Sequence, residues 1–177
     1  MDVMNKVDIK VDKIWHLANP ASPKYYGQNP IKTSNICYLG TNNMLKLAKK
    51  NNAKFLFSST SEVYGNQTKF PLREDFYPIL NHLSWRGCYS TSKLVAENLC
   101  YEYKKKYGVD TKIARIFNTY GPKLPLKDGR VIPDFIENAL LNNSLQINGD
   151  GSQTRSFCFV EDLVSGLILL MDSSLSG

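Results

Sequence analysis

The chain has 177 residues, of which 42% are hydrophobic, and a formal net charge of +6. This length suits one domain or two small lobes, and no apolar run approaches the ~20 residues that a membrane-spanning helix needs. The basic residues are spread out, the four cysteines form no Cys-x-x-Cys pair and residues 1–13 lack the apolar stretch of a signal peptide, so we expect a soluble, cytoplasmic protein that binds no nucleic acid, membrane or metal.

In the first two thirds of the chain, short apolar runs alternate with stretches of helical periodicity. The apolar runs predict three strands, over residues 13–18, 54–57 and 111–117. Apolar residues at helical spacing predict helices over 33–51 and over 89–107, the second ending at Gly108. Strand, helix, strand, helix, strand at this spacing predicts right-handed βαβ units and a parallel sheet.

The remaining segments are less regular. Residues 66–85 form a long, proline-containing connection, and such connections are usually functional or mobile. Beyond residue 117 the sequence predicts a break at 118–122, a helix over 131–141, a short strand at 145–147 and a helix over 161–171. The predicted fold class is therefore α/β. A partial Rossmann-like, doubly wound parallel sheet occupies residues 1–117, and part of a small second lobe, packed closely on the first, occupies residues 118–177.

Polar residues gather where the second predicted strand ends. Residues 58–65 read Ser-Ser-Thr-Ser-Glu-Val-Tyr-Gly, and open α/β sheets bind ligands at the carboxyl ends of their strands. Tyr89 and Lys93 lie one turn apart on one face of the next predicted helix. A free tyrosine has a pKa near ~10, and an ammonium one turn away lowers it. The phenol can then take the proton of a substrate alcohol while hydride leaves the same carbon. Taken alone, such a pair also occurs by chance on solvated helices.

Six motifs in a fixed order carry a resemblance that decides between these readings. They are His-Leu-Ala-x-Pro-Ala-Ser-Pro (16–23), Ser-Thr-Ser-Glu-Val-Tyr-Gly (59–65), Arg-x-Cys-Tyr-x-x-x-Lys (86–93), Ala-Arg-Ile-Phe-Asn-Thr-Tyr-Gly-Pro (114–122), Asp-Gly-Arg-Val (128–131) and Gly-Asp-Gly-x-Gln-Thr-Arg-Ser-Phe (149–157). Together they resemble the extended short-chain dehydrogenase/reductases that act on nucleotide sugars. Among these, the chain is most similar to UDP-glucuronate decarboxylases, also called UDP-xylose synthases, and the resemblance covers nearly all of it.

The resemblance implies a bound NAD that is reduced and reoxidised within one turnover, while UDP-glucuronate becomes UDP-xylose through a 4-keto intermediate. Tyr89 would take the proton of the sugar 4-hydroxyl, Lys93 would hold the cofactor ribose, and Thr60 would bond the 4-oxygen. Ser61 and Glu62 match positions that place the sugar ring and its carboxylate. The other expected substrate contacts are Asn118 and Arg155. The other expected cofactor contacts are Asp2, Val3, Leu17, Asn19, Ser58, Thr119 and Arg130.

The same loop weighs against related reactions without excluding them. Nucleotide-sugar 4,6-dehydratases usually have Asp-Glu after the threonine, and simple 4-epimerases usually lack the Glu. Thr60-Ser61-Glu62 therefore favours decarboxylation, with a dehydratase or an epimerase as the alternative. A non-catalytic chain that only assembles with partner subunits is the alternative from another class.

The chain departs from the family in what it lacks. The family begins with a strand, a Gly-x-x-Gly-x-x-Gly loop and a helix, whose backbone donors hold the cofactor pyrophosphate. That loop does not occur in the 177 residues, and the last of them match the middle of the family's substrate lobe. We therefore expect a chain without the first βαβ unit, whose strand at 13–18 has an open edge. Such an edge predicts poor solubility, or pairing with a separate chain that supplies the glycine-rich unit.

Smaller departures concern the substrate more than the chemistry. Cys37 stands where the family usually has Asn, and Asn148 where a Tyr is usual beside the nucleotide. Residues 89–93, Tyr-Ser-Thr-Ser-Lys, resemble the wider superfamily more than the decarboxylases. In the family the helices that match 33–51 and 89–107 form the dimer interface, so the resemblance also implies a homodimer.

Overall fold

The computed structural model describes residues 2–125 and 129–175, so Asp128 of the motif at 128–131 lies outside the described residues. Three strands form the predicted parallel sheet, in the order β1-β2-β3. They are β1 (Lys13–His16), β2 (Lys54–Thr60) and β3 (Thr111–Ile116). The second strand differs from its prediction, because it continues to Thr60 and its last three residues still pair with β3. These polar residues therefore belong to the end of the strand, where the ladder fixes their positions.

A nearly continuous helical run follows β1. It consists of α2 (Pro30–Asn35), a π-helical stretch (Ile36–Gly40) and α3 (Thr41–Asn51). The prediction of a helix over 33–51 is confirmed, although the run already begins at Pro30. The short helix α1 (Pro23–Gln28) is not predicted, because six residues are too few to show a period.

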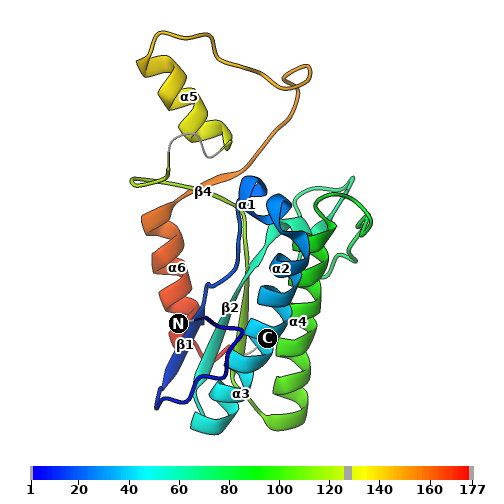
Figure 1. Ribbon diagram of the computed structural model, residues 1–177, viewed down its shortest axis with the longest axis vertical. Helices are drawn as coiled ribbons and strands as arrows, with labels where there is room; N and C mark the ends of the chain where they lie inside the picture. The colour runs from blue at the N-terminus through cyan, green and yellow to red at the C-terminus, as the bar shows by residue number, and fades with distance from the viewer. Residues whose placement is uncertain (1, 126–128, 176–177) are drawn as a thin grey trace.

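The helix α4 (Gly87–Tyr107) carries the predicted Tyr-Lys pair. It ends at Gly108, whose φ of 67° is the left-handed cap that the sequence predicts. Helices cover both faces of the sheet, as expected for a doubly wound fold. Figure 1 shows α3 and α4 on one side and α6 (Val160–Asp172) on the other. Phe55 and Phe57 of β2 are buried with Leu45 and Ala96 in the core between the sheet and the helices. Burying each large apolar side chain contributes roughly 1.5–3 kcal/mol, so this packing fixes α4 against β2.

Beyond residue 117 the sequence predicts the helices correctly and the strands wrongly. The helices α5 (Val131–Leu140) and α6 lie where they are expected. Instead of a break at 118–122, β4 (Asn118–Tyr120) pairs in parallel with β5 (Phe157–Phe159), a strand that the sequence does not reveal. The strand predicted at 145–147 is wrong, since the described chain has no strand there and its apolar side chains are exposed.

The last helix returns from this region to the sheet. Met171 is fully buried and its carbonyl accepts a hydrogen bond from the Lys54 ammonium at 3.4 Å. Lys13 of β1 forms an ion pair with Asp172 at the end of the same helix. In Figure 1, α5 by contrast stands well away from the sheet. The division into lobes at 117/118 stays a prediction. Within the described ranges, no helix has both the length and the apolar character that crossing a membrane requires.

Candidate active site

Tyr89 and Lys93 lie near the start of α4, and both are buried against the carboxyl end of β2. Tyr89 is 6% exposed and Lys93 is 3% exposed. The Lys93 ammonium lies 5.8 Å from the centre of the Tyr89 ring and 4.7 Å from that of Phe57. It donates a hydrogen bond of 2.6 Å to the backbone carbonyl of Ser58. The predicted pair therefore shares one buried space, at the edge of the sheet where the sequence places it.

Burial sets the proton affinity of both groups. It raises the pKa of Tyr89 to about 12, and a side-chain hydrogen bond with Thr60 and the charge of Arg130 oppose this only in part. Burial also lowers the pKa of Lys93 to about 8, against the influence of Cys37 and Glu97. The prediction that Lys93 lowers the pKa of the phenol is therefore wrong for this state of the chain. The reason is that loss of solvation disfavours a charge on either group.

The segment Thr60-Ser61-Glu62 carries the strand into a short 3₁₀ helix, η2 (Ser61–Tyr64). The Thr60 hydroxyl caps this helix by accepting a hydrogen bond of 3.2 Å from the Glu62 N–H. The Glu62 carboxylate accepts one of 2.9 Å from the Arg86 guanidinium. Burial raises the pKa of Glu62, and the Arg86 charge opposes that rise. Ser61 is half-buried at the first position of η2. The loop thus places the Thr60 hydroxyl against the Tyr89 phenol, and the Glu62 carboxylate, paired with Arg86, near both.

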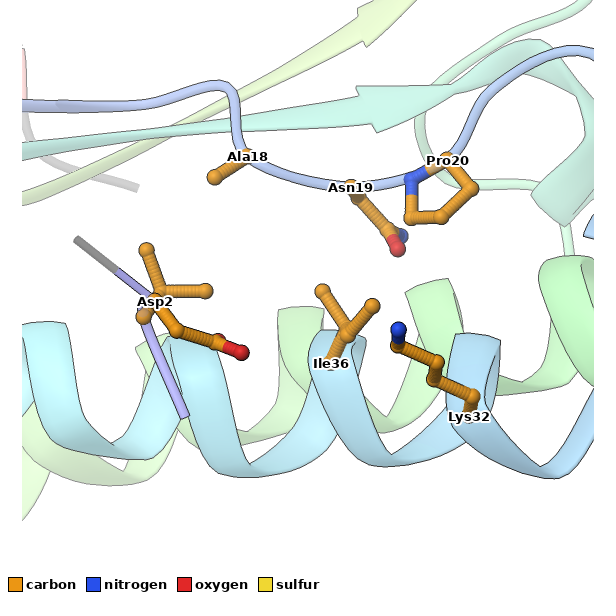
Figure 2. Close-up of a pocket in the computed structure, with 7 residues that line it drawn as sticks. Asp2, Ala18, Asn19, Pro20, Lys32 and Ile36 are labelled. Atoms are coloured by element: carbon orange, nitrogen blue, oxygen red, sulfur yellow. The ribbon is translucent and has the colours of Figure 1, made fainter. Parts of the chain in front are cut away.

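A pocket of about 560 Å³ lies between the first residues, the segment after β1 and the helical run. It is lined by Asp2, Val3, Ala18, Asn19, Pro20, Lys32 and Ile36, so three of the predicted cofactor contacts meet in it. In Figure 2 the Asn19 side chain extends from the loop toward the helix that carries Ile36 and Lys32. Both polar atoms of the Asn19 amide are buried, and in the described part of the chain the interaction found for this amide is a weak one with the Cys37 thiol. A buried amide, a carboxylate and one lysine beside apolar walls fit the adenosine and phosphate parts of a dinucleotide.

Other predicted site residues lie around this centre. Ser58 belongs to it, because its carbonyl binds Lys93 and its hydroxyl donates a hydrogen bond of 3.1 Å to the His16 carbonyl. Arg130 occupies the N-cap position of α5, and its charge lowers the pKa of Tyr89. Thr119 is half-buried in β4, whereas Leu17 is 55% exposed.

Two predicted substrate residues bond backbone carbonyls just before β5. Asn118 is exposed and its amide donates to the Ser156 carbonyl at 3.1 Å. Arg155 is exposed as well, and its guanidinium donates to the carbonyl of its neighbour Thr154 at 2.6 Å. Their assignment to the substrate stays a prediction.

Sequence reasoning missed three residues of this region. The sequence could have pointed to Arg86, because this residue is the first of the motif at 86–93. Its ion pair with Glu62 is visible only in the structure. Lys32 of α2 lines the pocket described above. Tyr26 of α1 stacks on Tyr89 with the ring centres 4.9 Å apart. Neither Lys32 nor Tyr26 lies at a position that periodicity marks.

Comparison with known proteins agrees with this geometry. Residues 2–177 match the model of the NAD dependent epimerase/dehydratase family. The chain belongs to this family. It is 49% identical over 175 residues to UDP-glucuronic acid decarboxylase 1 of Danio rerio, with 99% of the chain and 42% of that protein covered. It is 47% identical over 176 residues to UDP-glucuronic acid decarboxylase 3 of Arabidopsis thaliana, of which it covers 52%. The chain thus spans about half the length of the curated relatives it matches.

Solved structures share the fold across nearly the whole chain. A UDP-N-acetylglucosamine 4-epimerase from Methanobrevibacter ruminantium M1 superposes with a TM-score of 0.91 at 30% identity, covering all of this chain and 58% of that one. A UDP-glucuronic acid 4-epimerase from Bacillus cereus, solved with UDP-glucuronic acid and NAD, gives 0.80 at 30% identity, covering 94% of this chain and 51% of that one. The predicted α/β, Rossmann-like fold is confirmed.

Proposed function

We propose that this chain carries the catalytic centre of an NAD-dependent enzyme that converts UDP-glucuronate to UDP-xylose and carbon dioxide through a 4-keto intermediate. The observation that carries the proposal is the buried cluster in which Tyr89, Lys93 and Thr60 meet beside Glu62. The curated relatives that are 46 to 49% identical to the chain are named UDP-glucuronic acid decarboxylases. Ser61, at the place of the dehydratase Asp, cannot deliver a proton for loss of water in the way a carboxylic acid does.

Each residue of the cluster has a defined role. Tyr89 accepts the proton of the sugar 4-hydroxyl, and Thr60 hydrogen-bonds the same oxygen. Because burial keeps Tyr89 protonated at neutral pH, its own proton has to leave before it can accept another. Lys93, whose pKa is about 8, is a neighbouring group that exchanges protons in this range. The Arg86 guanidinium holds the Glu62 carboxylate in a fixed place beside the sugar ring.

Bound NAD would supply the acceptor, and later the donor, of the hydride at C4 of the sugar. Asp2, Val3 and Asn19 would hold its adenosine part in the pocket described above. Lys93 and Ser58 would meet the ribose next to the reacting ring. The 4-ketone lies β to the sugar carboxylate, and a β-keto acid loses carbon dioxide readily, so the cluster needs to promote only the redox step and the proton transfer.

The test follows product formation from UDP-glucuronate and NAD. The chain is assayed alone and with an added N-terminal segment that carries a Gly-x-x-Gly-x-x-Gly loop, and UDP-xylose is separated from UDP-galacturonate. Tyr89→Phe should reduce the rate at least ~100-fold, since general acid–base catalysis contributes roughly 10²–10⁴-fold. The matched control is Tyr103→Phe, which removes a hydroxyl that bonds the Asn42 side chain instead. Unchanged xylose formation in Tyr89→Phe would refute the proposal, and UDP-galacturonate as the product would replace it with an epimerase.

The non-catalytic alternative is decided by NAD binding. A ligand that binds only the folded chain raises its unfolding temperature by mass action. If NAD causes no shift, even with the added segment, a chain that only assembles with partners becomes the better account.

We propose two assemblies on the same footing. The outer surfaces of α3 and α4, with the π-helical stretch before α3, would form a homodimer, and they expose Tyr38, Leu39, Val95 and Tyr101. The free edge of β1 would pair with a strand from outside the 177 residues that belongs to the glycine-rich unit. In the described chain β1 pairs only with β2, and Trp15 beside the free edge is 37% exposed. Sedimentation of the chain with and without the added segment tests both. We also propose a cytoplasmic location, which fractionation of cells checks.

A further inference from the structure

Glu97 is a buried carboxylate of α4 that the proposed mechanism does not use. It lies one turn beyond Lys93 on the same helix and is 8% exposed. A buried ion pair adds little net stability compared with apolar residues of similar volume. Stability alone therefore gives little reason for a charge at this place, and the contacts of Glu97 indicate a role in the site.

Glu97 and Lys93 contact two successive residues of β2. The Lys93 ammonium donates a hydrogen bond of 2.6 Å to the Ser58 carbonyl, and the Ser59 hydroxyl donates one of 2.5 Å to the Glu97 carboxylate. The Ser58 carbonyl belongs to the planar peptide group that joins Ser58 to Ser59. A hydrogen bond that holds Ser59 therefore also holds the direction of the carbonyl that binds Lys93.

The Glu97 carboxylate is itself held by β3. Arg115 donates two hydrogen bonds to it, of 3.1 Å from Nε and 2.9 Å from Nη2, and such bidentate pairs fix orientation. The Arg115 guanidinium also donates to the Glu74 carbonyl at 3.2 Å and lies 4.8 Å from the centre of the Tyr64 ring. The carboxylate is thus a fixed point against which the end of β2 is oriented.

The charge of Glu97 also acts on Lys93. Burial lowers the pKa of Lys93 to about 8, against the influence of Cys37 and Glu97. The other titratable groups that face the ammonium are Tyr89 and Cys100 of α4 and His16 of β1. Glu97 contributes the carboxylate of this set, so its charge favours the ammonium form of Lys93.

We propose that Glu97 is a positioning residue of the reaction, which orients, through Ser59, the strand-end carbonyl that holds Lys93 beside Tyr89. This inference rests on the proposed function, because it takes Lys93 as the group that meets the cofactor ribose and exchanges protons with Tyr89. It goes beyond that function by assigning a role to a residue that acts on the site only through its neighbours.

The first test compares Ser59→Ala with Thr111→Val in the chain with the added N-terminal segment. Both changes remove a buried hydroxyl that bonds α4 from the sheet, and the Thr111 hydroxyl donates to the Cys100 carbonyl at 3.3 Å, farther along the helix. Each should lower the unfolding temperature by about 2–4 °C. Ser59→Ala should reduce kcat about 3- to 10-fold at saturating NAD and UDP-glucuronate, because Lys93 is displaced, whereas Thr111→Val should change kcat less than about 2-fold.

The second test is Glu97→Gln, which keeps the size of the side chain and removes its charge. In the ligand-free chain it should lower the pKa of Lys93 below its wild-type value, because a neighbouring negative charge stabilises an ammonium. NMR of carbon-13-labelled lysine side chains measures this pKa, and the Lys93 signal is assigned by its absence in Lys93→Arg. In turnover, the pH at which kcat reaches half of its maximum should fall as well, because Lys93 loses its proton more easily.

If Ser59→Ala and Thr111→Val lower the unfolding temperature alike and both leave kcat unchanged, Glu97 has only a structural role and the inference is overturned. A Lys93 titration that Glu97→Gln leaves unchanged also overturns it. This titration needs no turnover. If Glu97→Gln shifts it while the wild-type chain with the added segment forms no UDP-xylose, the action of Glu97 on Lys93 is supported, and it is the proposed function that fails.

Discussion

The stability of the site depends on a buried ion pair one turn beyond Lys93. Glu97 of α4 is 8% exposed, and its carboxylate accepts a hydrogen bond from the Ser59 hydroxyl on β2. Arg115 of β3 donates two more, of 3.1 Å from Nε and 2.9 Å from Nη2. The bidentate geometry is the strong form of such a pair. It joins the helix that carries Tyr89 and Lys93 to both strands beneath it.

We predict that Arg115→Met destabilises the chain by about 3 kcal/mol. Removing one partner of a buried pair leaves the other as an uncompensated charge, which costs roughly 3–5 kcal/mol. The lower end applies because the side chain of Arg115 is still 22% exposed, although that of Glu97 is only 9% exposed. For a chain of this size, about 3 kcal/mol corresponds to a fall of roughly 6–12 °C in the unfolding temperature.

The assay is urea unfolding of Arg115→Met, Glu97→Leu and the double variant. The double variant should recover most of the loss, because it leaves no unpaired charge, and the coupling energy should exceed about 1.5 kcal/mol. The control is Arg73→Met, which breaks the ion pair with Asp75. The side chains of Arg73 and Asp75 are 67% and 66% exposed, so this change should alter stability by less than about 0.5 kcal/mol. A cost for Arg115→Met no larger than that of the control would refute the reasoning. Additive single changes would refute it as well.

Three further predictions concern pH and glycines. Burial lowers the pKa of His16 to about 4, so the stability that the neutral ring provides is lost as the pH falls from about 6.5 to about 4, by roughly 3 kcal/mol in all. Thermal unfolding across this range should show the loss in wild type and in the exposed control His82→Gln, but not in His16→Gln. Gly87→Ala should destabilise the chain by at least about 2 kcal/mol, because its Cβ would lie 2.1 Å from the His82 carbonyl oxygen. Gly166→Ala should stabilise it by about 0.5–1 kcal/mol, because Gly166 lies inside α6 with open space around it, and urea unfolding measures both changes.

The sequence predicts the parts of the fold whose local pattern and packing agree. The three strands of the sheet and the long helices lie close to where the periodicity places them, because each buries one apolar face on the other. The sequence does not predict the paired strands β4 and β5. They have three residues each and come from positions about 40 residues apart, and no local pattern marks so short a non-local pairing. At 145–147 an apolar-polar-apolar pattern misled the prediction, since Leu145 and Ile147 are exposed and pair with no strand among the residues that the structure describes.

The sequence correctly predicts that Tyr89, Lys93 and Thr60 lie together, and it does not predict their electrostatics. Thr60 ends β2, and Tyr89 and Lys93 lie near the start of α4. These two places meet at one edge of the sheet, and the spacing of the elements along the chain predicts this. Their pKa values depend on how deeply the helix is buried, and sequence does not report depth. The ammonium of Lys93 was therefore expected to dominate the phenol, whereas loss of solvation acts more strongly on both groups.

This reversal bears on how the proposed chemistry begins. A phenol with a pKa of about 12 next to an amine with a pKa of about 8 stays protonated in a chain without ligands. If Tyr89 can transfer a proton only when substrate is bound, the empty site does not exchange this proton with solvent. We predict that ligand binding supplies the change in environment that makes Tyr89 a base. On this argument Tyr89 becomes acidic only in the complex with its ligands. Titration of the free chain should therefore give Tyr89 a pKa above the ordinary value of a tyrosine.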